Sequence, residues 1–155
     1  MARVITFTLN GEKRTVEVED NETLLDVIRY KLKETSVKAG CWKGECGLCT
    51  VEMNGKLVKS CMVLAVEADG AEILTAAGLA REGKLAPIQK AFIEHNAFQC
   101  GFCTPAYVIA AHNFLKNNPN PTREQIKHFF SGILCRCTGY LQIIRAIEDA
   151  AKYYK

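Results

Sequence analysis

Residues 40–50 read GCWKGECGLCT, a stretch in which cysteines stand among glycines. Cys41, Cys46 and Cys49 are spaced as C-x4-C-x2-C, and the next cysteine, Cys61, follows after a gap of eleven residues. Glycine lets a backbone turn tightly and approach a bound group where a side chain would collide. Backbone N–H groups in such a loop can point at sulfur atoms that carry negative charge. The stretch therefore predicts a loop that encloses a compact group held by cysteine sulfur.

The spacing of these four cysteines is that of plant-type [2Fe–2S] ferredoxins. Two other interpretations are buried structural cysteines and a zinc site. Zinc prefers paired C-x₂₋₄-C knuckles, which Cys46 and Cys49 satisfy but Cys41 and Cys61 do not. We therefore predict that Cys41, Cys46, Cys49 and Cys61 bind a first [2Fe–2S] cluster.

The other four cysteines form a C-x2-C pair, Cys100 and Cys103, and a C-x-C pair, Cys135 and Cys137. Taken alone this pattern also suits zinc, because C-x2-C is a common zinc half-site. Each pair, however, directly precedes a predicted helix start, at Thr104-Pro105 and at Thr138. Two helix N-termini would then direct partial positive charge at the thiolates, and Arg136 would add to it. This arrangement favours a second four-thiolate cluster.

Composition and length narrow the class of protein. The chain has 155 residues, and two domains of about 75 residues would each be marginally stable alone. A formal charge of +3 gives no argument for nucleic acid as a partner. The sequence shows no export signal and no apolar run near the roughly 18 residues of a membrane span, so we expect a cytoplasmic protein. Disulfides are disfavoured there, and metal is the first explanation for eight cysteines.

The first half of the chain has the pattern of a small mixed unit. Residues 4–9 and 14–18 alternate in hydrophobicity around Asn10-Gly11, a strong hairpin signal, and residues 50–53 and 56–58 flank a second one, Asn54-Gly55. Residues 22–32 have helical spacing, and residues 71–75 suit a last strand. We predict a compact sheet that holds one helix.

The second half is predicted to be helical. Pro87 suits the first turn of a helix that runs to about Phe98. Thr104 resembles an N-cap that is followed by Pro105 at the first position of a helix to about Asn117. Thr122 and Gln125 form a capping box for a third helix, and Thr138 would cap a fourth that runs to about Ala151. The change of period places one domain at residues 1–77 and another at residues 84–155.

Three segments resemble a known family: residues 40–50, residues 99–105 (QCGFCTP) and residues 134–140 (LCRCTGY). They resemble the iron–sulfur small subunit of the molybdenum hydroxylases, the family of xanthine dehydrogenase, aldehyde oxidoreductase and carbon monoxide dehydrogenase. The resemblance covers nearly the whole chain. It implies an α+β fold in which an N-terminal β-grasp [2Fe–2S] ferredoxin-like domain is followed by an all-α, four-helix [2Fe–2S]-binding domain.

The resemblance also implies a function, that of the non-catalytic electron-transfer subunit of an oxidoreductase. Electrons would pass from a molybdopterin centre through the helical-domain cluster and then the ferredoxin-like cluster to FAD or another acceptor. The implied partners are a large molybdopterin-binding subunit and a medium FAD-binding subunit, with a dimer of heterotrimers as one arrangement. Because the sequence stops at Lys155, we expect these partners to be separate chains. Cys137 would be the ligand nearest the pterin, and Gln99 would contact it.

The chain departs from the family pattern at Leu48, Ala106 and Ile133, where Ala, Gly and Asn respectively are frequent. The polar side chain missing at Ile133 could have donated a hydrogen bond near Cys135. Two rival functions remain, a zinc-stabilised interaction module and a free-standing ferredoxin. The helical second half argues against a simple ferredoxin, which needs only the first unit. The sequence does not indicate the substrate or the final electron acceptor.

Overall fold

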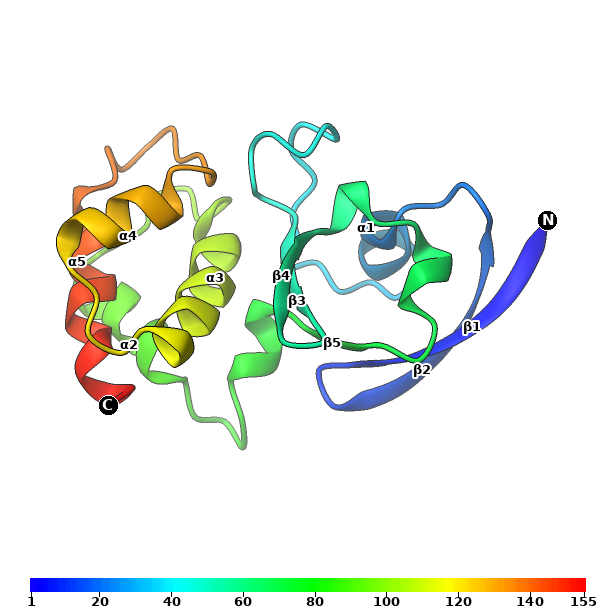
Figure 1. Ribbon diagram of the computed structural model, residues 1–155, viewed down its shortest axis with the longest axis horizontal. Helices are drawn as coiled ribbons and strands as arrows, with labels where there is room; N and C mark the ends of the chain where they lie inside the picture. Colours follow the sequence, from blue (N-terminus) through cyan, green and yellow to red (C-terminus); the bar gives the residue numbers. More distant parts are fainter.

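Two hydrophobic cores lie side by side along the long axis of the molecule (Figure 1). The computed structural model describes residues 1–155, and its chain termini lie at opposite ends of that axis. One core contains buried residues from Ile5 to Ile73, and the other contains buried residues from Ala76 to Ala151. The first half is mixed α and β and the second is helical, which confirms the predicted α+β class. The domain limits 1–77 and 84–155 stay a prediction.

The first half is a five-stranded sheet with the strand order β2-β1-β5-β3-β4. Strands β1 (Ala2–Leu9) and β2 (Glu12–Glu19) form one antiparallel hairpin, and β3 (Thr50–Met53) and β4 (Lys56–Lys59) form another. Both Asn-Gly turns adopt positive φ at both residues, as such two-residue hairpins require. Strand β5 (Glu72–Leu74) pairs parallel to β1 and antiparallel to β3, and so joins the two hairpins.

One helical segment packs on this sheet. Thr23 and Asp26 form a capping box that starts α1 (Leu24–Asp26), and the chain continues as a π-helical turn at Val27–Lys31. Its side chains Leu24, Leu25, Val27 and Ile28 are fully buried in the first core. This is the helix predicted at residues 22–32, and the sheet that holds it is the arrangement expected of a β-grasp unit.

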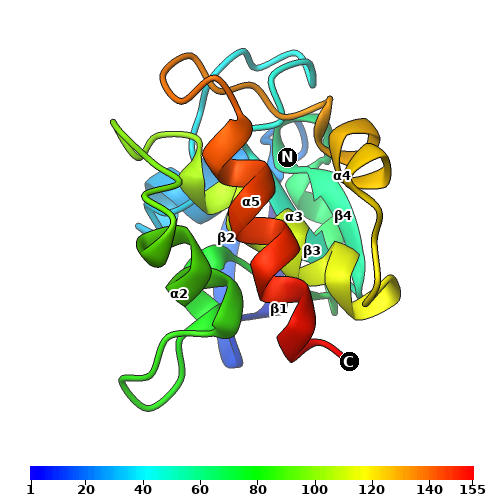
Figure 2. The ribbon, with the colours of Figure 1, turned by 90° about the vertical axis from the view of Figure 1, so that its left-hand side faces the viewer.

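Four helices form the second half, as predicted: α2 (Pro87–Glu94), α3 (Thr104–Asn117), α4 (Arg123–Phe130) and α5 (Leu141–Ala150). Figure 2 shows α5 in front, with α2, α3 and α4 around it. The capping box of Thr122 and Gln125 is present at the start of α4. No helix of the chain is both long and apolar enough to span a membrane.

Two predicted helix caps are wrong. Cys103, not Thr104, precedes the first residue of α3, and the Thr104 hydroxyl is buried without a hydrogen-bond partner. The last helix begins only after Tyr140, which has a φ of 70°. Thr138 lies earlier, where its hydroxyl contacts the Cys135 sulfur at 3.0 Å and accepts from the Tyr140 amide at 3.2 Å. Because the Thr138 hydroxyl already forms hydrogen bonds with groups of its own loop, it is not available to cap the helix.

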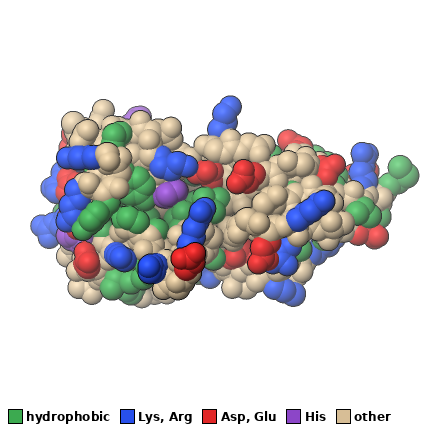
Figure 3. All heavy atoms as spheres, turned by 90° about the horizontal axis from the view of Figure 1, so that it is seen from below, with side chains coloured by type: hydrophobic (Ala, Val, Ile, Leu, Met, Phe, Trp, Pro, Cys, Tyr) green, Lys and Arg blue, Asp and Glu red, His purple; other side chains and the backbone are tan.

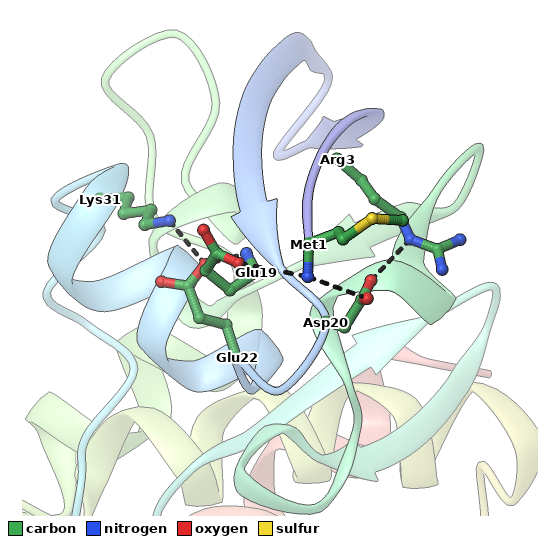
Figure 4. Close-up of polar contacts among 6 residues, drawn as sticks. All are labelled: Met1, Arg3, Glu19, Asp20, Glu22 and Lys31. Atoms are coloured by element: carbon green, nitrogen blue, oxygen red, sulfur yellow. Dashed lines mark hydrogen bonds and ion pairs between the residues drawn. The ribbon is translucent and has the colours of Figure 1, made fainter.

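The open end of the first hairpin carries a group of exposed ion pairs (Figure 4). The amino group of Met1 lies 3.3 Å from Asp20, whose other oxygen accepts from Arg3 at 2.6 Å. Lys31 of the π-helical turn pairs with Glu22 at 2.6 Å. Water and salt screen such exposed pairs, so they contribute little to stability and serve mainly to keep the strand ends together.

Candidate metal centres

The first four cysteines meet at one end of the sheet. Cys41, Cys46 and Cys49 lie in the loop that precedes β3, and Cys61 lies in the 3-10 turn at Ser60–Met62, two residues past the end of β4. The pairing of Thr50 with Lys59 and a hydrogen bond from the Ser60 amide to the Cys49 carbonyl place Cys49 and Cys61 together. Burial and then the adjacent Cys49 raise the pKa of the Cys61 thiol to about 11. The hairpin thus brings the distant fourth cysteine to the loop.

The loop around Cys41 and Cys46 supplies N–H donors to sulfur. The Cys41 sulfur accepts from the amides of Cys46 at 3.3 Å, Lys43 at 3.4 Å and Glu45 at 3.3 Å. These bonds, led by that of Cys46, lower the pKa of Cys41 to about 6. A Cβ added to Gly40 would lie only 2.8 Å from the Cys46 sulfur. The loop is therefore a cradle for negatively charged sulfur, and a side chain at position 40 would crowd the Cys46 sulfur.

The second four cysteines meet at the adjacent end of the helical half. Cys100 and Cys103 precede α3, and Cys135 and Cys137 lie in the loop between α4 and α5. The sulfurs of Cys100 and Cys137 are 3.5 Å apart. Burial and then the neighbouring Cys135 raise the pKa of Cys103 to about 12. Burial acts against ionisation of Cys135 as well, but hydrogen bonds from the Thr138 hydroxyl and amide outweigh it and lower the pKa of Cys135.

The thiols of both sites come together in pairs. No group of three or more His, Cys, Asp or Glu side chains is arranged to hold a single metal ion. A zinc ion would need four ligands around one point, whereas a two-iron cluster takes two cysteines at each iron. The donor set therefore fits two [2Fe–2S] clusters, and the pairs are Cys41 with Cys46, Cys49 with Cys61, Cys100 with Cys137, and Cys103 with Cys135.

The two sites lie side by side. Six of the eight cysteines line one cavity of about 440 Å³, which Phe102, Leu134 and Arg136 also line. The Leu134 amide, next to Cys135, donates a hydrogen bond of 3.0 Å to the carbonyl of Cys46. One backbone hydrogen bond thus connects a residue of the first set to the neighbour of a residue of the second.

Two tyrosines support the second site in ways that the sequence did not reveal. Tyr107 is fully buried and its hydroxyl donates to the carbonyl of Ile133; burial raises its pKa, so it stays a donor. The Tyr140 hydroxyl accepts from the Cys135 amide at 3.3 Å. Both contacts hold the chain that carries Cys135, and no spacing rule places either hydroxyl there.

One end of the second site is open to solvent. Cys100, Cys137 and Gln99 are exposed, whereas Cys103 and Cys135 are buried. Gln99 precedes Cys100, which contacts Cys137, so the structure brings the two predicted pterin-contacting residues to one exposed end. Large apolar side chains, each about two-fifths or more exposed, occur in the same segments: Phe98, Phe102, Leu134, Tyr140 and Leu141. An apolar rim of this kind is typical of a docking surface.

Ile133→Asn is expected to raise the reduction potential of the second cluster, because hydrogen bonds to cluster sulfur raise potentials. Ile133 is buried, and its side chain lies against Gly47 of the first loop. The substitution therefore also places a polar group between the two loops. A redox titration followed by EPR tests the prediction, with iron content as a control for cluster loss. An unchanged or lower potential at full iron content would contradict it.

Two protein-family models match the chain. The model described as "2Fe-2S iron-sulfur cluster binding domain" matches residues 7–80, and the one described as "[2Fe-2S] binding domain" matches residues 75–148. The chain is 47% identical to the nicotine 6-hydroxylase small subunit of Paenarthrobacter nicotinovorans, a match that covers 94% of this chain and 88% of that protein. It is also 47% identical to the nicotinate dehydrogenase small FeS subunit of Eubacterium barkeri, over 96% and 94% of the two chains.

Solved structures give the same result. A chain of quinoline 2-oxidoreductase from Pseudomonas putida 86 superposes with a TM-score of 0.96 at 41% identity, over 99% of this chain and 96% of that one. The aldehyde oxidoreductase of Desulfovibrio desulfuricans superposes with a TM-score of 0.92 at 40% identity, over 98% of this chain and 17% of that one. The similarity therefore covers both halves and both cysteine sets.

Proposed function

We infer the function of this chain from the family to which it belongs, the iron–sulfur subunits of the molybdenum hydroxylases. It is a non-catalytic electron-transfer subunit of an oxidoreductase with two [2Fe–2S] clusters. We propose that Cys41, Cys46, Cys49 and Cys61 bind the first cluster and that Cys100, Cys103, Cys135 and Cys137 bind the second.

The observation that carries this ligand assignment is the pairing of thiols in each half, in two sites that share one cavity. When bound, the clusters take up and release single electrons between the molybdopterin centre and FAD or another acceptor on partner subunits. The chain supplies the sulfur ligands, the amide donors that stabilise their negative charge, and the buried surroundings. Hydrogen bonds stabilise negative charge most directly at two sulfurs. The Cys41 sulfur accepts from three backbone amides, and the Cys135 sulfur contacts the hydroxyl and the amide of Thr138.

We propose that the exposed end of the second site faces the molybdopterin-binding subunit, with Gln99 and Cys137 in contact with the pterin. The exposed apolar side chains of Phe102 and Leu134 support this, because they line the same cavity as Cys100 and Cys137 and would be covered by a partner. A medium FAD-binding subunit would complete a heterotrimer, and two heterotrimers would form the full assembly. We propose the cytoplasm as its location. The named relatives are themselves subunits, which supports an assembly of separate chains.

Low-temperature EPR of the dithionite-reduced protein, together with iron and acid-labile sulfide assays, tests the ligand assignment. We expect two distinct S = 1/2 signals and about four iron and four sulfide per chain, from two two-iron clusters. One signal with about two iron and one zinc per chain would show that the second site binds zinc and not a cluster. Anaerobically purified protein without iron or signal would overturn the assignment.

A further inference from the structure

A polar contact joins the two halves of the chain away from the cysteines. The side-chain amide of Asn113, on α3, donates to the carboxylate of Glu52 at 2.8 Å and to the carbonyl of Gly55 at 2.9 Å. Glu52 lies on β3 and Gly55 in the turn between β3 and β4. Asn113 is 9% exposed and Glu52 is 7% exposed, so both are largely removed from water. One side chain of the helical half thus holds two groups of the sheet.

The orientation of the Asn113 amide is fixed. Asn117, one turn further along α3, donates to the Asn113 backbone carbonyl at 2.8 Å and lies 3.5 Å from its side-chain oxygen. The Asn113 nitrogen is therefore the atom that faces the sheet. A buried carboxylate that lost this donor would be left without its hydrogen bond, which is costly. The contact therefore tolerates little change in geometry.

Each partner in this contact lies on a regular element that begins at a proposed ligand. Strand β3 starts directly after Cys49, and Glu52 is three residues beyond it, about 10 Å at strand rise. Helix α3 starts directly after Cys103, and Asn113 is ten residues beyond it, about 15 Å at helix rise. At the cluster end the two halves are joined again, by the hydrogen bond from Leu134 to Cys46. The contact of Asn113 with Glu52 therefore joins α3 to β3 directly, while the bond near the cysteines joins the loop before β3 to the loop before α5.

Between the halves, this part of the interface opens into a polar groove. The groove holds about 930 Å³ and its lining includes Glu52, Arg81, His112 and Lys116. Figure 3 looks onto the lower face of the molecule, where a histidine lies near side chains of both charges. Leu57 and Leu74, the strand neighbours of Glu52, do pack against the helical core. Apolar packing is non-directional, so it restricts the relative orientation of the two halves only weakly. A hydrogen bond requires a particular distance and angle between donor and acceptor, and so restricts that orientation more strongly.

We propose that the contact of Asn113 with Glu52 is a positioning contact that fixes the spacing and mutual orientation of the two clusters. The proposal rests on the ligand assignment given above. Asn113 touches neither cluster site and acts through α3 and β3. Its removal changes the geometry between the clusters and leaves the clusters themselves in place.

The test measures the magnetic interaction between the two reduced clusters, which depends steeply on their distance and on their relative orientation. Asn113→Leu removes the donor and leaves Glu52 unpaired. The double variant Glu52→Leu, Asn113→Leu replaces both partners by apolar groups, a change that is often neutral for stability, and so remains informative if the single variant does not fold. The matched control is Tyr154→Phe, which removes a 2.8 Å hydrogen bond to His112, the neighbour of Asn113 on α3, within the helical half.

We expect both Asn113 variants to keep about four iron per chain and both EPR signals, while the line shape that the interaction between the clusters produces differs from that measured for the wild type. Tyr154→Phe should keep the wild-type line shape. A purely stabilising role predicts that the double variant, with no stranded charge, regains the wild-type line shape, and that result would overturn the proposal. So would an equal change in Tyr154→Phe. A wild-type protein with one signal or too little iron would instead refute the ligand assignment.

Discussion

Cys103→Ser is expected to abolish the EPR signal of the second cluster and to halve the iron content, from about four to about two per chain. Cys103 is buried at the start of α3 and is paired with Cys135. Iron–sulfur clusters select soft thiolate ligands, and a serine hydroxyl of nearly the same size is a hard and far weaker acid. The variant therefore keeps the shape of the site and loses its metal chemistry.

The matched variant is Cys49→Ser in the first half. Cys49 is also buried and is also paired with a second thiol, that of Cys61. It should remove the other EPR signal and leave the one that Cys103→Ser abolishes. Loss of zinc from Cys103→Ser, in a protein that shows a single cluster signal before and after the substitution, would show that the second site is not a cluster. Full iron with both EPR signals unchanged in either variant would show that the substituted cysteine is not a ligand.

The parts of the fold that the sequence predicted correctly depend on short-range patterns. Asn10-Gly11 and Asn54-Gly55 have few alternatives to a tight hairpin turn, and Thr122 caps α4 with Gln125 three residues away. The cysteine spacing is of the same kind, because C-x4-C-x2-C constrains one loop. Such features need no knowledge of the rest of the chain.

The predictions that were wrong concern positions where a local rule competes with a contact of the site. Thr138 is of a residue type that is common at helix N-caps. Its hydroxyl, however, lies against the Cys135 sulfur, and the last helix starts after Tyr140. Thr104 follows a cysteine that takes the place before the helix. Contacts between the halves, such as that of Asn113 with Glu52, have no local pattern at all, because they form only when two separate cores pack together.

Gly47→Ala should damage both sites at once, since Gly47 lies where the loop that carries Cys46 is in close contact with the loop that carries Cys135. Its φ is 73°, and an added Cβ would lie 2.3 Å from the carbonyl oxygen of Gly132 and 3.0 Å from the Cα of Ile133. Both of those neighbours are backbone atoms, which cannot rotate away as a side chain can. The loop that carries Cys46 and the loop that carries Cys135 must separate, and the hydrogen bond from Leu134 to Cys46 is lost with them.

Gly11→Ala is the matched control for Gly47→Ala. Both glycines have a positive φ, but only at Gly47 would an added Cβ also clash with neighbouring atoms. Gly11 has a φ of 85° at a hairpin tip, and an added Cβ would meet nothing within 4 Å. The left-handed backbone alone costs about 1–2 kcal/mol, so Gly11→Ala should be destabilised by about that amount. Overpacking adds about 1–3 kcal/mol, so Gly47→Ala should lose about 2–5 kcal/mol.

The measurement is denaturation followed by the visible absorbance of the clusters, with EPR of each variant before unfolding. Gly47→Ala should have the lower denaturation midpoint of the two and should show both signals weakened or broadened, whereas Gly11→Ala should keep both signals unchanged. Equal midpoints would mean that the first loop moves away from Gly132 at no cost. In that case the close contact between the loops would not be what holds the two sites together, and the contact of Asn113 with Glu52 would be left as the principal restraint on their geometry.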